Sequence, residues 1–458
     1  MNDTKKNNSI IHKSAIAAIA TPVGEGGIAV IRVSGKDTIS IVNQAFQGKD
    51  LTSLDSHTIH FGKIVDKNNL PVDEVLISLF HSPRSYTGEE TVEISCHGGV
   101  LVTQKVLETI LSLGVKAAEA GEFTQRAFLN GKLDLEQAEA VADIIHAKSI
   151  KAVDAAHQQL QGKLGDYVRS FRQQIIDATA MIELELDFIE EDVEFANKEQ
   201  LRKLLQDVDT ELTNLLDTYE TGRLVKDGVK TVLIGRPNAG KSTLLNTLVG
   251  SDRAIVTEIA GTTRDTIDVD WNFDGLLFKL IDTAGLRETE DVVEAEGVKR
   301  SQADLVIYLK DLSQAFTEEE RKEIAAFQKR AGETPFILIG TKADIEADRE
   351  WRTEFDLKIS AVKEENIKDL KILLKNRALE NKHYDASSLL VTSSRHRDAL
   401  LKTKEHIQAA LTGLDNGLTG DFLSIDLRAA LNELGTVTGE ITNEHILDSI
   451  FSRFCIGK

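Results

Sequence analysis

The sequence has few of the residues that cross-link a chain or anchor it in a membrane. Its 458 residues include two cysteines, Cys96 and Cys455, so we expect no disulfide framework, and this usage suits a reducing cytosol. No run approaches the roughly eighteen consecutive apolar residues of a transmembrane helix. The apolar stretch SAIAAIA follows three lysines but is short and leads into a Gly-rich segment, so we interpret it as a first strand. We therefore expect a cytoplasmic protein with no membrane span.

The chain has no excess of positive charge, because 74 acidic residues outnumber 54 Lys and Arg residues. The formal net charge is −20, and residues 131–227 alone hold 11 basic against 21 acidic residues, with a peak in ELELDFIEEDVE. Non-specific nucleic-acid binding needs clustered Lys and Arg, so an RNA partner must be held locally or with the help of another protein. The acidic run itself has a simpler interpretation as a solvated helix face.

Proline is rare, and none of the five lies between Val141 and Arg236. That segment is rich in Ala, Leu, Gln and Glu and is predicted to be helical. Before it, runs such as IAVIRVSG and TVEISCHGG mix with a helical stretch, LVTQKVLETILSLG, as in an α+β domain. After it, KTVLIG, LLFKLIDTAG, DLVIYLKD and PFILIGTKAD predict a doubly wound parallel sheet.

We therefore expect a multidomain α+β and α/β protein, since a chain of this length exceeds one core. The predicted domains are an N-terminal α+β domain (1–125), a first helical part (126–227), an α/β domain (228–381) and a second helical part (382–458). Because helical segments flank the α/β domain, we expect it to be inserted into one helical bundle.

The motif GRPNAGKS fits the phosphate-loop pattern GxxxxGK[ST] between a predicted strand and a predicted helix. Its backbone N–H groups would curl around phosphates, Lys241 would reach the β and γ oxygens, and the Ser242 hydroxyl would bind Mg²⁺. GTTRD supplies Thr263 as a second Mg²⁺ ligand. Asp282 would hold Mg²⁺ through water, and the Gly285 backbone would sense the γ-phosphate.

The base is predicted to be guanine. Asp344 in TKAD can accept from guanine N1–H and from its amino group, but would face a lone pair in adenine. The segment ISA would offer backbone donors to the guanine oxygen. The motifs together predict this GTP-binding set: Asn238, Ala239, Gly240, Lys241, Ser242, Thr243, Thr257, Glu258, Ile259, Ala260, Gly261, Thr262, Thr263, Asp282, Thr283, Ala284, Gly285, Thr341, Lys342, Asp344, Ser360 and Ala361.

With GRPNAGKS, IVTEIAGTTRD, IDTAGLRE and the terminal FCIGK, the chain resembles the MnmE (TrmE) family of tRNA-modification GTPases, almost from end to end. The resemblance implies a homodimeric GTP hydrolase that acts with an MnmG-type flavoprotein, which carries FAD, in a heterotetramer or larger complex. Together they install an aminomethyl-type group, such as carboxymethylaminomethyl, at C5 of the wobble uridine of certain tRNAs. A reduced folate, 5-formyl- or methylene-tetrahydrofolate, supplies the one-carbon unit.

The resemblance also implies site residues. The N-terminal domain is similar to folate-binding domains that dimerise, and the family's folate contacts fall on Arg32, Glu93, Lys132 and Lys458. One departure is Thr341, where guanine-specific GTPases usually have Asn; threonine keeps a hydroxyl but loses an amide that braces neighbouring loops.

Leu286 stands where Ras-like GTPases have the glutamine that orients the attacking water. The resemblance assigns that role to Glu294, whereas the sequence alone does not distinguish it from Glu288, Glu290 and Asp291 of a solvated acidic loop. It also assigns a K⁺ site, in place of an arginine finger, to Asn238 with Thr257, Ile259 and Thr262. The resemblance further implies that nucleotide-dependent dimerisation of two Ras-like P-loop G domains (228–381) drives GTP hydrolysis.

Some interpretations stay open at this point. Cys455 is either a thiol close to the modification chemistry or a buried small hydrophobe, and His97 is either a proton shuttle or a hydrogen-bonded structural histidine. A non-catalytic GTP-gated scaffold and a ribosome-assembly GTPase are the alternative functions.

Overall fold

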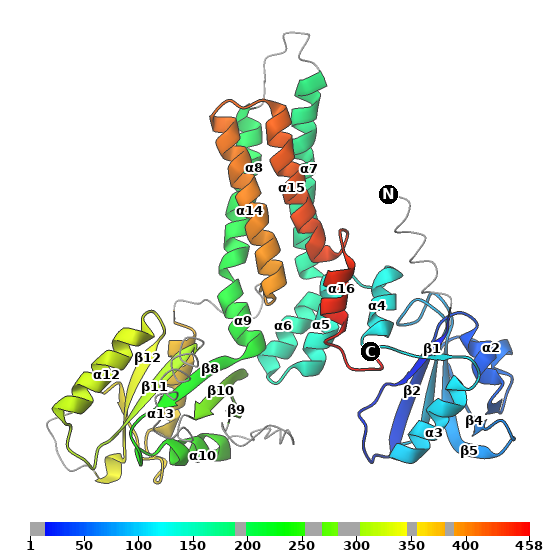
Figure 1. Ribbon diagram of the computed structural model, residues 1–458, viewed down its shortest axis with the longest axis horizontal. Helices are drawn as coiled ribbons and strands as arrows, with labels where there is room; N and C mark the ends of the chain where they lie inside the picture. Colours follow the sequence, from blue (N-terminus) through cyan, green and yellow to red (C-terminus); the bar gives the residue numbers. More distant parts are fainter. Residues whose placement is uncertain (1–13, 188–197, 252–267, 283–302, 346–354, 381–388) are drawn as a thin grey trace. The chain divides into compact units, whose positions relative to one another are not determined.

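The computed structural model describes residues 14–187, 198–251, 268–282, 303–345, 355–380 and 389–458, and they form two compact units (Figure 1). Unit 1 contains the described residues up to Ala142, together with Gln159–Thr179 and Leu427–Lys458. Unit 2 contains Asp143–Gln158 and the described residues of Ala180–Asp426. Both units take in helical residues, and the four domain boundaries given above stay predictions.

Unit 1 is built on a seven-stranded sheet in the order β3-β4-β5-β6-β2-β1-β7. Neighbouring strands are antiparallel, except that β1 and β7 are parallel. Residues alternate along β2, so that Ala29, Ile31 and Val33 point into a core with two helices, α2 and α3. The strands are β1 (Ile16–Ile19), β2 (Ile28–Ser34), β3 (Phe46–Gln47), β4 (Thr58–Val65), β5 (Pro71–Phe80), β6 (Thr91–His97) and β7 (Lys116–Ala117), and the helices are α2 (Thr38–Asn43) and α3 (Val100–Leu111). The predicted α+β character and the first strand are confirmed.

The opposite face of this sheet is covered at one end by α4 (Glu122–Leu129), whose Phe123 packs on Ile16 and Ala18. The C-terminal segment returns to the same region. α16 (Glu444–Phe451) and Phe454 pack against α5 (Leu135–His146), and Ile456 forms a β-bridge with Ala120. The last residues of the chain are therefore part of the N-terminal fold.

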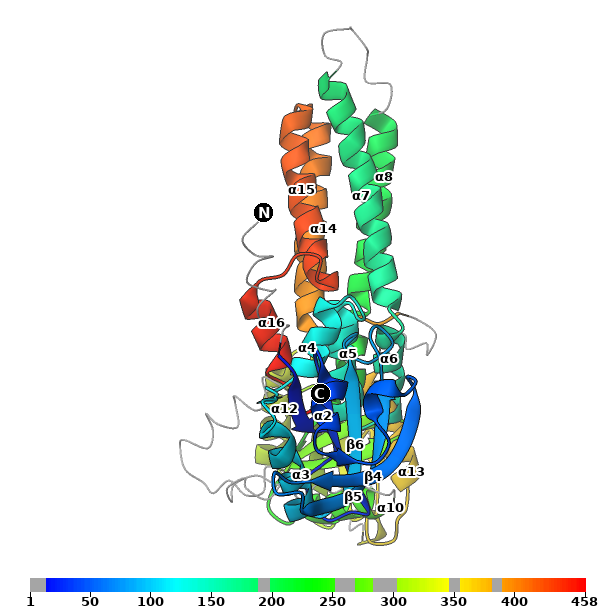
Figure 2. The ribbon, with the colours of Figure 1, turned by 90° about the vertical axis from the view of Figure 1, so that its right-hand side faces the viewer.

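The proline-free segment is helical, as predicted: α5, α6 (Ile150–Leu160), α7 (Lys163–Asp187), α8 (Lys198–Asp217) and α9 (Tyr219–Asp227). Helices α14 (Ser394–Asp415) and α15 (Gly420–Thr438) follow the α/β residues. In unit 2, α8 and α14 lie side by side (Figure 2). The buried positions of α8, Leu201, Leu205, Val208, Leu212 and Leu215, recur every three or four residues and so form one apolar stripe.

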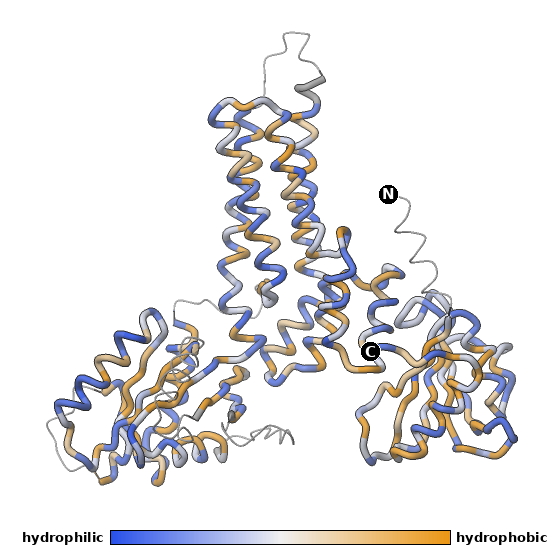
Figure 3. Tube along the Cα trace, in the orientation of Figure 1, coloured by the Kyte–Doolittle hydropathy of each residue, from blue (hydrophilic) through white to orange (hydrophobic). Residues whose placement is uncertain are grey.

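Unit 2 contains a six-stranded sheet in the order β13-β12-β11-β8-β10-β9. The strands are β8 (Val229–Ile234), β9 (Asp268–Phe273), β10 (Leu276–Asp282), β11 (Leu305–Asp311), β12 (Phe336–Thr341) and β13 (Leu357–Lys358). α10 (Lys241–Ser251) and α13 (Ile367–Ala378) cover one face, and α12 (Glu318–Ala331) covers the other (Figure 1). In Figure 3 the strands of this sheet are mostly hydrophobic, whereas α12 is largely hydrophilic. The predicted doubly wound sheet is present.

One strand differs from the prediction. β9 runs antiparallel to β10, and the sequence pattern did not indicate it. The two strands are joined by Asp274 and Gly275, which both have positive φ angles, 49° and 75°. Asp-Gly between two apolar runs is a strong hairpin signal, and it was present in WNFDGLLF.

In the part of the chain that the structure describes, no helix has both the length and the apolar character needed to cross a membrane.

Unit 1 buries one carboxyl group deeply. Glu136 in α5 is fully buried, and its Oε1 accepts a hydrogen bond of 2.6 Å from the N–H of Gly165 in the first turn of α7. Its Oε2 is buried and has no hydrogen-bond partner. Burial raises the pKa of Glu136 from 4.5 to about 7, although the Gly165 hydrogen bond opposes the shift.

Glu136→Gln should therefore remove a pH dependence of stability. The folded pKa is raised, so the stabilisation is complete below the unfolded pKa and is lost as pH rises through about 7. At about 1.4 kcal/mol per pKa unit, the rise of the pKa from 4.5 to about 7 sets an upper limit of about 3.5 kcal/mol on this stabilisation. Urea unfolding at about pH 5 and about pH 8 should show the wild type losing stability relative to the Gln variant. Glu199→Gln, an exposed change in α8, should follow the wild type. Parallel behaviour of Glu136→Gln and wild type would contradict the assignment.

Candidate functional site: a nucleotide edge and an N-terminal charged cluster

The candidate nucleotide site lies at one edge of the unit 2 sheet. β8, β10, β11, β12 and β13 are parallel, so their carboxyl ends meet at the same edge. Each motif follows a strand end directly: GRPNAGKS follows β8, DTAG begins at the last residue of β10, TKAD begins at the last residue of β12, and ISA follows β13. This is the edge at which doubly wound sheets bind ligands.

The loop between β8 and α10 has the geometry of an anion-binding loop. Gly235 must be glycine, because an added Cβ would lie 2.5 Å from the Leu309 carbonyl oxygen. α10 begins at Lys241, so the N–H groups of its first turn have no partner within the helix. The Lys241 Nζ donates to the carbonyls of Gly235 (2.5 Å) and Arg236 (3.1 Å), which keeps its positive charge inside the loop. This donor set fits a phosphate group.

Residues next to the phosphate loop are of types that bind metal cations. Ser242 and Thr243 are exposed in the first turn of α10, and Asp282 ends β10 opposite Leu233 of β8. Hydroxyl and carboxylate oxygens are ligands that Mg²⁺ prefers. Asn238 is exposed and has a left-handed backbone, with φ 62°, which leaves its amide outside the protein core.

Thr341 connects three segments of the site. Its hydroxyl donates to the carbonyl of Ala239 in the phosphate loop (2.8 Å) and lies 3.1 Å from the carbonyl of Lys310 in β11. The hydroxyl that threonine keeps therefore braces the phosphate loop, although the amide of an asparagine is absent. The next residue, Lys342, has φ 59° and pairs with Asp311 at 2.6 Å. Hydrogen bonds from Lys342 and Ser313 outweigh burial and lower the pKa of Asp311.

The residues predicted to bind the base lie in two adjacent loops. Asp344 is in a short 3₁₀ helix (Ala343–Ile345), and the Ala343 N–H donates to the Ile359 carbonyl at 3.1 Å. Ser360 is buried, with its Oγ accepting from the Lys363 N–H. The Ala361 carbonyl accepts from Thr247 of α10 at 3.2 Å. Backbone bonds thus hold the TKAD and ISA segments together.

Several predicted residues lie outside the described part of the chain: Thr257, Glu258, Ile259, Ala260, Gly261, Thr262, Thr263, Thr283, Ala284, Gly285 and Glu294. Their roles stay predictions.

In unit 1, the four expected folate residues lie near one end of the sheet. Arg32 of β2 and Glu93 of β6 are directly opposite each other and form an ion pair of 2.8 Å. Both hydrogen bonds from the guanidinium go to Glu93 Oε1. The guanidinium also lies over the rings of Tyr86 (5.0 Å) and Phe123 (5.7 Å). The sequence pattern did not indicate these two aromatic residues, because they come from separate elements.

Lys132 and Lys458 reach the same region. Lys132 Nζ donates to the Pro83 carbonyl at 3.3 Å, in the loop that carries Tyr86. The Lys458 carbonyl accepts from the Phe123 N–H at 3.2 Å. Gly457 has φ 99°, and a Cβ there would lie 2.2 Å from the Ile19 carbonyl oxygen, so the chain end packs tightly against β1.

The open interpretations of Cys455 and His97 can now be narrowed. Cys455 is a free, exposed thiol, so the buried-hydrophobe interpretation is wrong. The imidazole Nδ1 of His97 lies 2.7 Å from Asp73 Oδ1, and the backbone N–H of His97 donates to Asp73 Oδ2. It is four residues along β6 from Glu93, about 13 Å away, which favours the hydrogen-bonded structural role.

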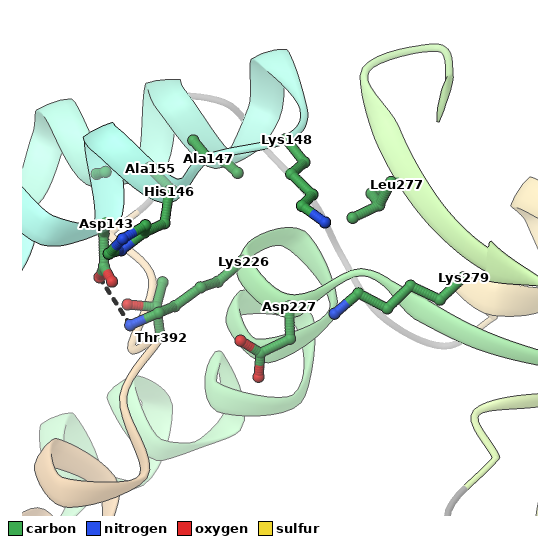
Figure 4. A pocket seen from close by; sticks show the side chains of 12 residues that line it. Asp143, His146, Ala147, Lys148, Ala155, Lys226, Asp227, Leu277, Lys279 and Thr392 are labelled. Carbon is green, nitrogen blue, oxygen red and sulfur yellow. Dashed lines mark ion pairs between the residues drawn. The ribbon is translucent and has the colours of Figure 1, made fainter. Parts of the chain in front are cut away.

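Two cavities contain none of the predicted residues. One of about 180 Å³ lies in unit 2 near the amino end of the parallel strands (Figure 4). Half of its lining residues are ionisable, namely Asp143, His146, Lys148, Lys226, Asp227 and Lys279, and Lys226 pairs with Asp143 at 2.7 Å. The other, of about 320 Å³ in unit 1, is lined by the loop after β1 and the first turn of α3.

Comparison with known proteins decides the family. The family model "GTP-binding protein TrmE N-terminus" matches residues 15–132, and the model "MnmE helical domain" matches residues 135–455. The "tRNA modification GTPase MnmE" of Salinibacter ruber is 46% identical over 455 residues, which cover 97% of this chain and 99% of the relative. The chain belongs to the MnmE family of tRNA modification GTPases.

The resemblance deduced from the motifs is thereby confirmed. A second MnmE relative, from Christiangramia forsetii, is 44% identical over 475 residues and covers 97% of this chain and 99% of its own length. Among solved structures, the G domain of the T. maritima FeoB iron transporter is 25% identical and covers 33% of this chain and 98% of that chain, with a TM-score of 0.27. At that TM-score the fold assignment rests on the sheet order of unit 2 itself.

Proposed function

We propose that this MnmE-family chain is a K⁺-stimulated GTP hydrolase that acts on tRNA together with an MnmG-type flavoprotein. The pair installs an aminomethyl-type group, such as carboxymethylaminomethyl, at C5 of the wobble uridine and takes the carbon from a reduced folate. Identity of 44–46% with MnmE relatives, over nearly the whole chain, carries this proposal. The sheet edge that collects the phosphate-loop, TKAD and ISA motifs supports its GTPase part.

In the hydrolytic step, the protein binds and orients GTP. The first-turn N–H groups of α10 and the Lys241 ammonium donate to phosphate oxygens, and Asp344 accepts from the guanine edge. Ser242, with Asp282 through water, would hold Mg²⁺, which would supply positive charge to offset the negative charge of the phosphates. Asn238 would contribute an oxygen to K⁺, and the bound cation would offset charge that develops on the β/γ bridge. Glu294 is the proposed residue that orients water.

In unit 1, the proposed folate site uses charges and stacking surfaces already in place. Glu93 Oε1 is occupied by Arg32, so the second oxygen of the carboxylate is the one available to the donor edge of a pterin. Lys132 and Lys458 supply cations suited to the glutamate tail of a folate. The exposed Cys455 lies three residues from Lys458, so we propose its thiol as the group near the modification chemistry.

The homodimer is also proposed, and an exposed face of the unit 1 sheet supports it. Arg32, Glu93, Ser78 and Ile59 are successive cross-strand partners and therefore share that face. Ile59 and its neighbour Phe61 are 66% and 65% exposed. Such apolar exposure on a sheet is typical of an interaction surface. Sedimentation equilibrium should give twice the 50.4 kDa mass of the chain.

The GTPase proposal predicts a cation effect. An arginine finger is worth roughly 10³–10⁵ in rate, so K⁺ in its place should raise turnover at least about tenfold over Na⁺ at equal ionic strength. Asn238→Gly should abolish the increase, since glycine removes the amide and tolerates the φ of 62°. Asn246→Ala, an exposed asparagine of α10, is the control and should keep the increase. Equal turnover in the two cations would contradict the K⁺ site.

The folate proposal predicts that Arg32→Met weakens folate binding, whereas the matched variant Arg84→Met does not. Arg32→Met keeps the length of the side chain but removes the charge, so it should weaken binding of 5-formyl-tetrahydrofolate by about tenfold or more, since hydrogen bonds to charged groups are worth about 1.5–3 kcal/mol. Arg84→Met alters an exposed arginine in the loop that also carries Tyr86 and should bind like the wild type. Calorimetric titration measures both, and GTP turnover should be unchanged. Identical titrations for the two variants would remove Arg32 from the site.

A further inference from the structure

Thr341 directs its hydroxyl into the protein and not toward a ligand. The residue is 3% exposed, and the hydroxyl lies within hydrogen-bond distance of two backbone carbonyl oxygens, those of Ala239 (2.8 Å) and Lys310 (3.1 Å). Its side chain also lies directly behind Gly240, where an added Cβ would be 3.7 Å from Thr341 Cβ. The hydroxyl therefore bonds the end of β12 to the phosphate loop and lies close to the Lys310 carbonyl of β11.

A proton count fixes what this hydroxyl can do. A threonine hydroxyl has one hydrogen, and both neighbouring carbonyls can only accept. The hydrogen is thus used inside the protein, and it is not available to a nucleotide base. The neighbouring ammonium of Lys342 is paired with Asp311 at 2.6 Å.

This matters for guanine, which presents two acceptors besides its donors, O6 and N7. In the proposed function, Asp344 takes the N1–H and amino donors, and the backbone of the ISA segment donates to O6. Asparagine, usual at position 341 in guanine-specific GTPases, has a longer side chain with two N–H donors, enough for a brace and for N7. Threonine has a single donor, and the structure shows where it goes.

We propose that Thr341 is a positioning residue for the phosphate loop, and that this chain recognises guanine without a hydrogen bond to N7. The inference rests on the proposed GTP binding of the same site. It defines the substrate class as purine nucleotides with a guanine Watson–Crick edge, whether or not position 7 is nitrogen.

The test compares GDP with 7-deaza-GDP, which has carbon at position 7, by equilibrium titration of the full chain with Mg²⁺. The wild type should bind the two with dissociation constants within about twofold. Thr341→Asn should restore a preference for GDP of about three- to tenfold, the worth of one neutral hydrogen bond. A role confined to structure would leave this ratio unchanged.

Two further variants test the brace. Thr341→Val removes the hydroxyl at nearly constant shape and leaves the Ala239 carbonyl without its donor, so it should weaken binding of both nucleotides equally, by about fivefold or more. Thr341→Ser keeps the hydroxyl and should bind like the wild type, which excludes a general folding defect at this position. Full affinity in the valine variant would overturn the brace.

The outcomes separate the inference from the function on which it rests. A wild-type preference for GDP over 7-deaza-GDP of about fivefold or more would overturn the inference and leave the GTPase proposal intact. Binding of neither nucleotide would overturn the GTPase proposal, and the inference with it.

Discussion

The parallel pairing of β8 with β10 and β11 is the constraint on which the nucleotide site depends. It aligns Asp282 with Leu233 and Tyr308 with Ile234, so strands far apart in the sequence end at one edge. Behind that edge, Lys310 and Glu320 form an ion pair of 2.9 Å, with both side chains almost fully buried. Removing either partner would leave an uncompensated charge in the interior, so the pair ties β11 to α12. Thr341 then bonds β11 and the phosphate loop to β12.

In unit 2, the β9–β10 hairpin of this sheet is bonded to helical residues around α6. Lys148, at the corner between α5 and α6, pairs with Asp270 of β9 at 2.7 Å, and its carbonyl accepts from Asn272. The Lys151 N–H donates to the Gly275 carbonyl in the turn of the hairpin. In the sequence, the β9–β10 hairpin lies between GTTRD and DTAG, the two motifs expected to respond to nucleotide. The segment between α5 and α6 is therefore attached to the hairpin that lies between these two motifs in the sequence.

The sequence was most informative where function depends on local geometry. GRPNAGKS needs a glycine at position 235 for steric reasons, and the loop and helix follow from that short segment. The long helices followed from composition and from the apolar spacing that α8 displays. β9 was missed although its Asp-Gly turn was visible, because the parallel pattern around it dominated the interpretation.

What the sequence could not provide depends on contacts between distant segments. The stacking of Arg32 on Tyr86 and Phe123 joins three elements, and the bond from Phe123 to Lys458 spans most of the chain. The chain end packs through Gly457 on Ile19, and the brace made by Thr341 follows from the register of β11 and β12. No local pattern encodes these arrangements.

The central claim, that the chain modifies the wobble uridine, is tested most directly by mass spectrometry of tRNA nucleosides. A strain lacking its own MnmE-family protein should be complemented with the wild type or with Cys455→Ser. The account predicts that the wild type restores an aminomethyl-type uridine, and that the serine variant leaves it unmodified while GTP turnover is preserved. The non-catalytic scaffold would instead be supported by full modification in the serine variant. No difference in wobble nucleosides with and without the wild-type protein would contradict the claim itself.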